Sequence, residues 1–259
     1  MSGLQGSLIW YELMTTDAEA ATAFYQPITG WTIEAMDGDH AGYRMISSPD
    51  SAVGGLLPLD QPMLDHGARP TWLMYIGVDD VDATAAAIAA AGGTTYVPPR
   101  DIPGIGRFAM LADPQGVPFY IMKPIPPEGG GESRAFDQTL IGHCTWNELR
   151  ATDLDAAIDF YGKIFGWTVT GSMPMGAMGD YKFLSHGDLA IGAAMGGASA
   201  EQPPHWLHYF RVANIDAAIE AVKSGGGQVL QGPHDVPGGD RVAICLDPQG
   251  AGVGFVARP

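Results

Sequence analysis

The sequence is poor in cysteine, and this scarcity excludes a class of small folds. Cys144 and Cys245 are the only thiols among 259 residues. They are too few for a disulfide framework, and they lack the C-x-x-C spacing of redox and zinc motifs. Both fall within segments that are expected to be strands, so we interpret them as inert core thiols. This cysteine usage favours the reducing cytoplasm.

Basic residues are also scarce, and long apolar runs are absent. Thirteen Lys and Arg oppose 29 Asp and Glu, which gives a formal charge of −16 that would repel nucleic acid and anionic lipid. The N-terminus MSGLQGSLIW lacks the pattern of a secretory signal. No apolar run approaches the roughly 20 residues that span a bilayer. We therefore expect no nucleic acid and no membrane as a partner.

What the sequence does contain is a long internal repeat. The stretch WYELMTTDAEAATAFYQPITGW, which begins at Trp10, returns as WNELRATDLDAAIDFYGKIFGW from Trp146, with matching residues 136 positions apart. Tyr43 and Tyr181 are 138 positions apart, and the two DPQG tetrapeptides are 134 apart. Three constant offsets over nearly the whole chain indicate a tandem duplication.

The duplication divides the chain into two modules joined by a linker. Residues 125–138 are rich in proline and glycine, which resist regular structure, so the modules are predicted at 7–124 and 139–258. In each module, apolar alternation, helix caps and turn residues predict one strand, one helix and three strands, twice over. The first helix, for example, begins after Asp17 and ends at Gly30.

This pattern resembles the vicinal oxygen chelate superfamily, which includes glyoxalase I, bleomycin-resistance proteins and extradiol dioxygenases. The resemblance is carried in each module by a Thr-Asp pair, a Phe-Tyr pair, a Gly-Trp pair, a Val-Asp helix opening, a glycine pair and DPQG. In the first module these are Thr16-Asp17, Phe24-Tyr25, Gly30-Trp31, Val78 to Asp82, Gly92-Gly93 and Asp113 to Gly116. In the second they are Thr152-Asp153, Phe160-Tyr161, Gly166-Trp167, Val212 to Asp216, Gly226-Gly227 and Asp247 to Gly250.

The resemblance implies an α+β fold of tandem glyoxalase-like modules. Each module would contain two βαβββ units that form a curled, mixed or antiparallel sheet, a cup with its helices outside. A small-molecule ligand would bind in the cup. The two modules would pair as a pseudo-dimer within a monomer, or the chain would form a homodimer.

The superfamily's metal ligands are His, Gln or Glu side chains that point into the cup. Alignment on the shared motifs places Trp10, Gly55, Leu73 and Tyr120 at the four ligand positions of the first module, and Trp146, Ala193, Leu207 and Gly254 at those of the second. None of these residues is an ordinary ligand for a divalent cation, so we expect no metal and no other cofactor. The alternative is one divalent metal, such as Zn, Ni, Fe or Mn, at a displaced site that draws on His205, His208, Glu12 and Glu148.

Strand alternation suggests what lines the cup instead. Because residues i and i+2 share a face, Trp10 should lie beside Glu12, and Trp146 beside Glu148. The two glutamates are our candidate catalytic residues, since a carboxyl in an apolar cup can act as a general acid or base. The alternative is a structural ion pair of each glutamate with Arg107 or Arg241.

Further residues are candidates for contact with a ligand. They lie mainly on the strand before each second helix, and together with Trp10 and Trp146 they are Tyr75, Tyr120, Tyr209, His205, His208 and Arg211. The polar residues among them favour the second module as the functional one. The loop Ser172 to Gly179 is a candidate lid over that cup. We interpret DPQG and the glycine pairs as turn and helix-end chemistry.

Three functions agree with these features. The first is a metal-independent protein of the bleomycin-resistance type that binds a small organic molecule in an aromatic and acidic cup. The second is a metal-dependent lyase or dioxygenase-type enzyme with a displaced site in the second module. The third is a structural protein whose cups are filled by their own side chains. Ligand-induced quenching of Trp fluorescence and sensitivity to chelators separate the three.

Overall fold

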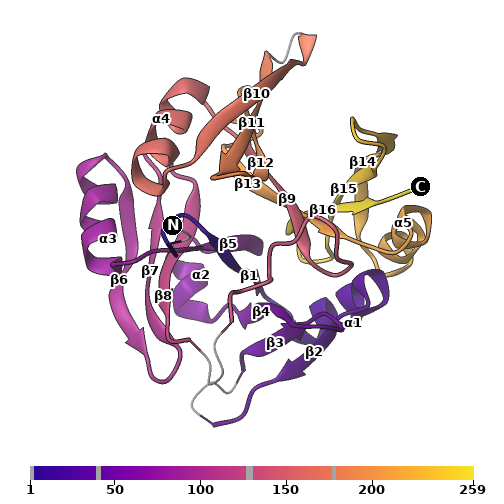
Figure 1. Ribbon diagram of the computed structural model, residues 1–259. Helices are drawn as coiled ribbons and strands as arrows, with labels where there is room; N and C mark the ends of the chain where they lie inside the picture. Colours follow the sequence, from indigo (N-terminus) through magenta and orange to yellow (C-terminus); the bar gives the residue numbers. More distant parts are fainter. Residues whose placement is uncertain (1–2, 39–41, 127–130, 177–178) are drawn as a thin grey trace. The chain divides into compact units, whose positions relative to one another are not determined.

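A computed structural model describes residues 3–38, 42–126, 131–176 and 179–259 of the chain (Figure 1). Its elements confirm the predicted α+β class and the tandem modules. Each described module begins with a strand, a helix and three strands, and then repeats this order. No helix in the described part of the chain is long and apolar enough to cross a membrane.

The elements of the first module cover residues 8 to 124. Its strands are β1 (Leu8–Thr15), β2 (Thr32–Ala35), β3 (Arg44–Ser47), β4 (Ala52–Pro58), β5 (Thr71–Gly77), β6 (Thr94–Ile102), β7 (Gly106–Ala112) and β8 (Pro118–Pro124). Its helices are α1 (Ala18–Thr29), α2 (Gln61–Asp65) and α3 (Val81–Ala90). The short helix α2 was not predicted.

The elements of the second module cover residues 144 to 257. Its strands are β9 (Cys144–Arg150), β10 (Thr168–Pro174), β11 (Asp180–His186), β12 (Leu189–Met195), β13 (His205–Arg211), β14 (Gln228–Asp235), β15 (Arg241–Leu246) and β16 (Gly252–Ala257). Its helices are α4 (Leu154–Phe165) and α5 (Ile215–Ser224). The predicted loop from Ser172 begins inside β10, and residues 177–178 of that loop lie outside the described residues.

Each module forms one eight-stranded mixed sheet. The strand orders are β2-β3-β4-β1-β5-β8-β7-β6 and β10-β11-β12-β9-β13-β16-β15-β14. Within them β1 pairs with β4, and β5 with β8, in parallel, as do their counterparts in the second module. The outer hairpins of both sheets are antiparallel. The predicted mixed sheet is therefore confirmed.

The helix ends follow the sequence signals closely. Asp17 and Asp153 cap α1 and α4, since each side chain accepts a hydrogen bond from the backbone amide three residues on. Gly30 and Gly166 end the same helices with φ angles of 74° and 73°, a left-handed conformation that glycine adopts without strain. The two aspartates therefore mark where the first helix of each module begins, and the two glycines mark where it ends.

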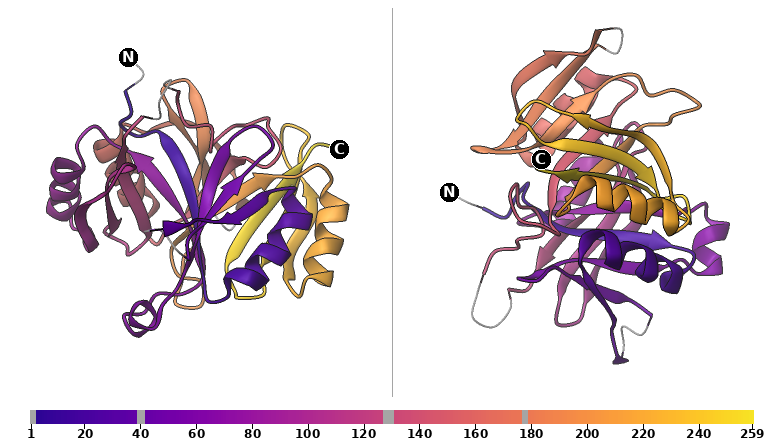
Figure 2. Two further views of the ribbon diagram at one scale, coloured as in Figure 1. Left: turned by 90° about the horizontal axis from the view of Figure 1, so that it is seen from below. Right: turned by 90° about the vertical axis from the view of Figure 1, so that its right-hand side faces the viewer.

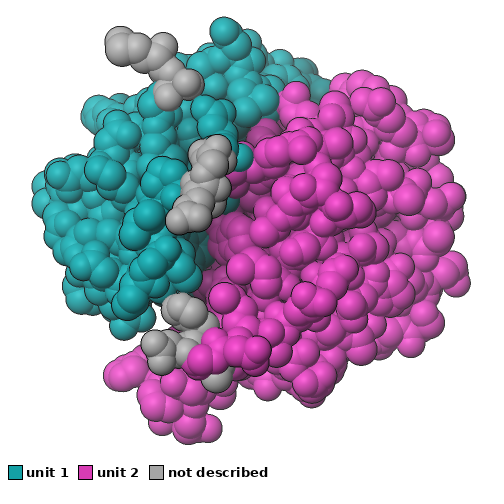
Figure 3. Space-filling view, turned by 60° about the horizontal axis from the view of Figure 1, so that its bottom comes forward, with its two compact units in different colours: residues 1–9, 74–132, 147–206 teal, residues 10–73, 133–146, 207–259 magenta. Residues whose placement is uncertain are grey.

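The chain packs as two compact units, and each unit takes segments from both modules (Figure 3). The first unit comprises residues 1–9, 74–132 and 147–206, and the second comprises 10–73, 133–146 and 207–259. In the second unit α1 lies beside α5, as Figures 1 and 2 both show. The repeated motifs therefore serve contacts between the two modules.

The core of the second unit shows how these contacts are made. The Tyr25 hydroxyl on α1 donates a hydrogen bond of 3.1 Å to the buried Asp247 carboxylate of the second DPQG. Trp72 Nε1 donates to the same hydroxyl at 2.9 Å. Gly227 has no side chain to clash with the ring of Phe24, which lies within 3 Å of the place where a Cβ would stand. Helix α1 of the first module therefore contacts the DPQG turn at Asp247 in the second module.

The first unit repeats the arrangement with the modules exchanged. The Tyr161 hydroxyl donates to Asp113 at 3.2 Å and accepts from Trp206 Nε1 at 2.9 Å. Burial raises the pKa of Asp113, although backbone amides of its own turn donate to it. DPQG does form turns, as predicted, but the interpretation as turn chemistry alone was incomplete, because each aspartate also receives a tyrosine from the other module.

Candidate functional site

The two faces of β1 carry different chemistry. Trp10 is half-buried and Glu12 is 3% exposed. Tyr11, between them, contacts His208 and Phe210 at ring-centroid distances of 5.1 and 5.7 Å. Since alternate residues of a strand point to opposite faces, Trp10 and Glu12 share the face away from Tyr11, as strand alternation predicts.

Tyr43, just before β3, joins these two side chains. Its hydroxyl accepts a hydrogen bond of 3.0 Å from Trp10 Nε1 and donates to the Glu12 carboxylate. Burial, and after it the charge of Glu12, raises the pKa of Tyr43 well above its ordinary value. The result is a chain of hydrogen bonds from indole to phenol to carboxylate, which we call the first Trp-Tyr-Glu cluster.

Gly55 makes room for this phenol. It lies opposite Glu12 in the parallel register of β1 and β4. A Cβ at position 55 would overlap the hydroxyl and the adjoining ring carbon of Tyr43. The space that a side chain at this position would need is therefore filled by Tyr43.

The second module repeats part of this arrangement. The Tyr181 hydroxyl donates a hydrogen bond of 2.9 Å to Glu148 Oε2, and Ala193 lies opposite Glu148 in the register of β9 and β12. Phe183 packs edge-on against Tyr181 at 5.8 Å. Unlike Glu12, Glu148 is only half-buried, so its carboxylate is the more accessible of the two.

The glutamates are not held by the arginines that we considered. Arg107 pairs with Asp82 at 2.6 Å and Asp101 at 3.0 Å, and Arg241 pairs with Asp216 at 2.8 Å. The alternative of an ion pair between each glutamate and Arg107 or Arg241 was therefore wrong in its partners. The tyrosine partners could have been found from the sequence, because Tyr43 and Tyr181 stand at the same 138-residue offset as Gly55 and Ala193.

The remaining predicted aromatic residues fall into two groups. In the first unit Tyr75 stacks on Tyr120, with ring centroids 4.2 Å apart and ring planes 12° apart. In the second unit Tyr209 forms a buried cluster with Leu207 and Val256, against which Trp146 packs. The structure thus brings Tyr75 together with Tyr120, and Trp146 together with Tyr209.

The polar residues of β13 do not converge. His205 is exposed and its Nδ1 lies 2.8 Å from the Pro203 carbonyl oxygen, whereas His208 is fully buried against Tyr11. Arg211 is buried and forms an ion pair of 2.7 Å with Asp240. His208 also lies on the opposite face of β13 from Tyr209, because the two residues are adjacent in the strand.

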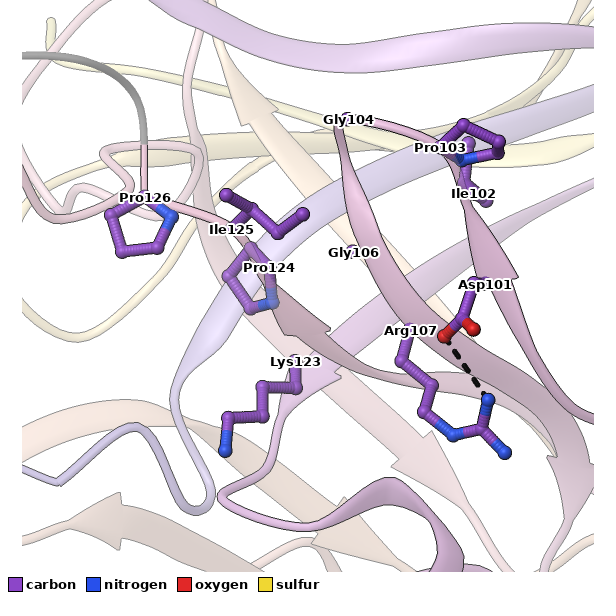
Figure 4. A pocket seen from close by; sticks show the side chains of 10 residues that line it. All are labelled: Asp101, Ile102, Pro103, Gly104, Gly106, Arg107, Lys123, Pro124, Ile125 and Pro126. Atoms are coloured by element: carbon purple, nitrogen blue, oxygen red, sulfur yellow. Dashed lines mark hydrogen bonds and ion pairs between the residues drawn. The ribbon is translucent and has the colours of Figure 1, made fainter.

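A separate pocket of about 420 Å³ lies at the end of the β6–β7 hairpin and the C-terminal end of β8 (Figure 4). It is lined by Asp101, Ile102, Pro103, Gly104, Gly106, Arg107, Lys123, Pro124, Ile125 and Pro126. Asp101 and Arg107 are paired with each other, which leaves few groups free for recognition. None of the predicted catalytic or ligand-binding residues lines this pocket.

The two cysteines are also accounted for. Cys144 and Cys245 are buried, and burial raises the pKa of their thiols to about 12 and about 11. A thiol with such a pKa is a poor nucleophile at neutral pH. Their burial agrees with the interpretation as inert core residues.

Comparison with known proteins identifies the family. A model of the Glyoxalase/Bleomycin resistance protein/Dioxygenase superfamily matches residues 7–121 and 140–255. The chain belongs to this superfamily. Both matched segments fall within the two predicted modules, so the superfamily's domain is present twice.

Two relatives match this chain along nearly their whole length. The chain is 34% identical to CFP32 of Mycobacterium tuberculosis (strain CDC 1551 / Oshkosh), which carries a provisional glyoxylase name, over 95% of this chain and 93% of that protein. It is 31% identical to the anthracycline biosynthesis protein DnrV of Streptomyces peucetius, over 97% of this chain and 93% of DnrV.

Solved structures of a glyoxalase and a dioxygenase share the fold. The Mn(II)-bound glyoxalase from Novosphingobium aromaticivorans superposes with a TM-score of 0.67 at 19% identity, over 98% of this chain and 82% of that one. The 2,3-dioxygenase LapB from Pseudomonas sp. KL28 gives a TM-score of 0.64 at 14% identity, over 98% and 93% of the two chains. At these identities the likeness concerns the fold alone.

The residues present do not fit the metal that such a relative holds. At the aligned ligand positions stand Trp10, Gly55, Leu73 and Tyr120, and Trp146, Ala193, Leu207 and Gly254. The nearby carboxylates, Glu12 and Glu148, each accept a hydrogen bond from a tyrosine. Across the described residues, no group of three or more His, Cys, Asp or Glu could hold a metal ion. The donor set thus differs from that of a divalent metal site.

Proposed function

We propose that this protein binds a small organic molecule through its first Trp-Tyr-Glu cluster and the hydrogen-bonded pair Tyr181 and Glu148, without a resident metal ion. One observation carries the proposal: the Tyr43 phenol fills the space beside Gly55 at an aligned ligand position and bonds to Glu12. In this chain the hydroxyl of Tyr43 fills the space beside Gly55, at a position that supplies a metal ligand in other members of the superfamily. This replacement favours recognition of a ligand by stacking and hydrogen bonding.

The chemistry of the clusters indicates what kind of ligand they would accept. A carboxylate accepts hydrogen bonds, so Glu12 and Glu148 favour a ligand that carries a hydroxyl or a protonated amine. The neighbouring Trp and Tyr rings offer apolar faces to a flat molecule. The chain's charge of −16 disfavours an anionic ligand.

The second module is the better candidate for binding. Glu148 is half-buried and flanked by Tyr181 and Phe183, which are half-buried as well. Glu12 is 3% exposed, so a ligand would have to open the first cluster before reaching it. We therefore place the first contact of the ligand at Glu148.

The names of relatives support an organic ligand in general terms. DnrV is named for anthracycline biosynthesis, and CFP32 for a glyoxylase. Both names concern small organic compounds. The metal-dependent alternative drew on His205, His208, Glu12 and Glu148, and the places of His205 and His208 on β13 do not favour it.

The test is a binding screen of the whole chain with a panel of flat compounds bearing hydroxyl, amine or carboxylate groups. A ligand should raise the melting temperature and quench Trp fluorescence, and a chelator should change neither effect. Replacing Glu148→Gln should weaken binding tenfold or more, since a hydrogen bond to a charged group is worth about 1.5–3 kcal/mol.

The matched control is Glu220→Gln, which removes an exposed acid on α5 that pairs with Lys223. This variant should bind as the unmodified chain does. Binding that disappears on addition of chelator would contradict the proposal, as would equal loss of affinity in both variants.

A further inference from the structure

Arg150, the last residue of β9, lies on the same face of that strand as Glu148. Alternate residues of a strand point to the same side of the sheet, and Leu149 between them is buried. The register of β9 and β12 sets Met195 opposite Arg150 and Ala193 opposite Glu148. At about 3.3 Å per residue, the carboxylate and guanidinium side chains begin about 6.6 Å apart along the strand. All of these residues belong to the first compact unit.

Arg150 differs from the other arginines in combining partial burial with the lack of an ion pair. The arginines that pair with a carboxylate are Arg44, Arg107, Arg134, Arg211 and Arg241. Among the described residues, no carboxylate pairs with Arg69, Arg100, Arg150 or Arg258, and of these Arg150 alone is half-buried. A charged side chain that is partly removed from water usually has a charged partner. The guanidinium of Arg150 can therefore take an acceptor that a ligand supplies.

The contacts that this guanidinium makes leave most of its donors available. Its Nη1 donates to Gln202 Oε1 at 3.3 Å, which is longer than an ordinary hydrogen bond of this kind, and Gln202 is exposed. The same nitrogen lies 3.9 Å from the place where a Cβ of Gly197 would stand, so a longer side chain at position 197 would cover it. Because a guanidinium has five N–H donors, several remain for a ligand.

The first module has no cation at the corresponding place. Met14 stands at the position of Arg150, since the two residues are 136 apart, as Trp10 and Trp146 are. Met14 is 3% exposed and lies opposite Leu57 in the register of β1 and β4. The combination of a glutamate with an arginine two residues on is thus particular to the second module.

We propose that Arg150 binds the ligand of the second module, and that this ligand is an uncharged aromatic hydroxy-carbonyl compound. Its hydroxyl donates to the Glu148 carboxylate, and its carbonyl oxygen accepts from the Arg150 guanidinium. A carboxylate only accepts hydrogen bonds and a guanidinium only donates them, so the two side chains select one group of each kind. The inference rests on the proposed function, because both side chains belong to the same site.

The spacing and the charge of the site narrow the ligand further. Side chains that begin about 6.6 Å apart suit a hydroxyl and a carbonyl at opposite ends of one aromatic ring. Tyr181, which bonds to Glu148, and Phe183, which packs against Tyr181, offer apolar ring faces beside it. The carboxylate of Glu148 and the chain's charge of −16 disfavour a ligand carboxylate in place of the carbonyl.

The first test compares three probes on the unmodified full chain. They are para-hydroxyacetophenone, which carries both groups, phenol, which has only the hydroxyl, and acetophenone, which has only the carbonyl. NMR titration of the ¹⁵N-labelled chain measures the dissociation constant of each. The probe with both groups should bind about tenfold or more tightly than either of the others, since each hydrogen bond involves a charged side chain. Equal affinities for para-hydroxyacetophenone and phenol would overturn the inference.

The second test replaces the arginine by the residue that the first module holds at this position. In Arg150→Met, para-hydroxyacetophenone should bind no more tightly than phenol, whose own affinity should not change. The matched control is Arg258→Met, which removes an exposed arginine and the same positive charge, and which should keep the tenfold preference. A preference that survives in Arg150→Met would show that the arginine only covers apolar surface with its stem, and would overturn the inference.

Glu148→Gln separates this inference from the proposed function. The substitution should weaken the binding of phenol and of para-hydroxyacetophenone alike and leave that of acetophenone unchanged. If it does not weaken phenol binding, or if no probe binds to the unmodified chain, the proposed function fails and the inference fails with it. If it weakens phenol binding while Arg150→Met keeps the preference for the carbonyl, the inference alone fails.

Discussion

Tyr43 is the residue on which the first Trp-Tyr-Glu cluster depends most. Its hydroxyl accepts from Trp10, donates to Glu12 and occupies the space beside Gly55. A phenol can do all three because it is both donor and acceptor at the end of a long rigid ring. Losing it would leave a buried carboxylate short of a donor.

Gly55→Ala tests how tightly this space is filled. The added methyl group would overlap the Tyr43 hydroxyl, so we expect a loss of about 1–3 kcal/mol in the free energy of unfolding. In a Tyr43→Ala background the same substitution should change the free energy by no more than about 0.5 kcal/mol, since the obstacle is gone. Chemical denaturation measures all four chains.

The reverse substitution in the second module, Ala193→Gly, is the control for this cycle. It removes a buried methyl group that the structure already accommodates, and it should cost about 1–2 kcal/mol through backbone entropy and the loss of that buried methyl group. Equal penalties for Gly55→Ala with and without Tyr43 would show that the tyrosine is not what limits position 55.

Residue patterns predicted part of this cluster. Alternation along a single strand correctly placed Trp10 and Glu12 on one face. The hydrogen bond from Tyr43 depends on how β3 and β4 register with β1, which local periodicity does not determine. For the same reason Arg107 was a wrong partner, because its bond to Asp82 joins β7 to α3.

Among the elements, the first DPQG turn makes hydrogen bonds to the segment that begins α4 in the other module. Gln115 Oε1 accepts from the backbone amides of Thr152 and Asp153, both at 2.8 Å, and its Nε2 donates to the Asp153 carbonyl. The turn of one module therefore holds the start of α4 in the other. The counterpart Gln249 has a buried Oε1 without a hydrogen-bond partner among the described residues.

A single hydroxyl explains this difference between the modules. In the first module the Asp17 amide donates to Thr15 Oγ1 at 3.3 Å. The second module has Ala151 at the position of Thr15, so the Asp153 amide is left to bond with Gln115. The two glutamines thus occupy the same motif, but the Gln115 side chain makes three hydrogen bonds to the other module, whereas Gln249 Oε1 has no partner among the described residues.

Gln115→Ala should therefore destabilise the protein more than Gln249→Ala does. The first removes a side chain that makes three hydrogen bonds, for an expected loss of about 1–3 kcal/mol, whereas the second removes an unsatisfied amide oxygen and should lose less than about 1 kcal/mol. Urea denaturation of both variants provides the comparison. If Gln249→Ala is the more harmful, the asymmetry between the turns is wrong.

The buried DPQG aspartates also predict a pH dependence. Burial raises the pKa of Asp247 above its ordinary value of 3.8, against the hydrogen bonds that it accepts. The folded chain therefore keeps this proton to a higher pH than the unfolded chain, and stability falls as the pH rises from about 4 through the raised pKa. Asp247→Asn should make this fall shallower.

Unfolding measurements from pH 4 to 7 would show the effect. The exposed Asp188→Asn is the control and should follow the unmodified chain. An Asp247→Asn variant whose stability varies with pH as steeply as that of the control would contradict the assignment.

Most elements were predictable because their signals are local. Asp17 and Gly30 mark the two ends of α1, and alternating apolar residues mark the strands. The helix α2 was missed because it has five residues and no buried side chain, so it shows no apolar period. Its only local signals are the cap Asp60 and the proline that follows.

At the scale of the whole molecule, the modules of the sequence and the compact units of the structure differ. Each module supplies one eight-stranded sheet, yet each unit combines segments of both modules. The sequence patterns could not predict this exchange, because they show that a segment is repeated but not whether it packs against its own module or the other one. The hydrogen bonds from Tyr25 to Asp247 and from Tyr161 to Asp113 are contacts between modules that this exchange creates.

Residues 1–126 alone should therefore not form a folded monomer. Tyr25 would lack Asp247, and Asp113 would lack Tyr161, so buried polar groups would lose their partners. We expect a dimer, in which a second copy supplies these partners, or aggregation, and rescue on co-expression with residues 131–259. Light scattering and circular dichroism distinguish these states, and a folded, monomeric fragment would contradict the exchange of segments.

The measurement that tests the central claim most directly is the metal content of the full chain, by elemental analysis after incubation with Zn, Ni, Fe or Mn and dialysis. The proposed metal-independent clusters predict far less than one equivalent of any of these metals per chain. Close to one equivalent, retained through dialysis and lost in Glu148→Gln but not in Glu220→Gln, would contradict the account and assign the acidic cluster to a metal instead.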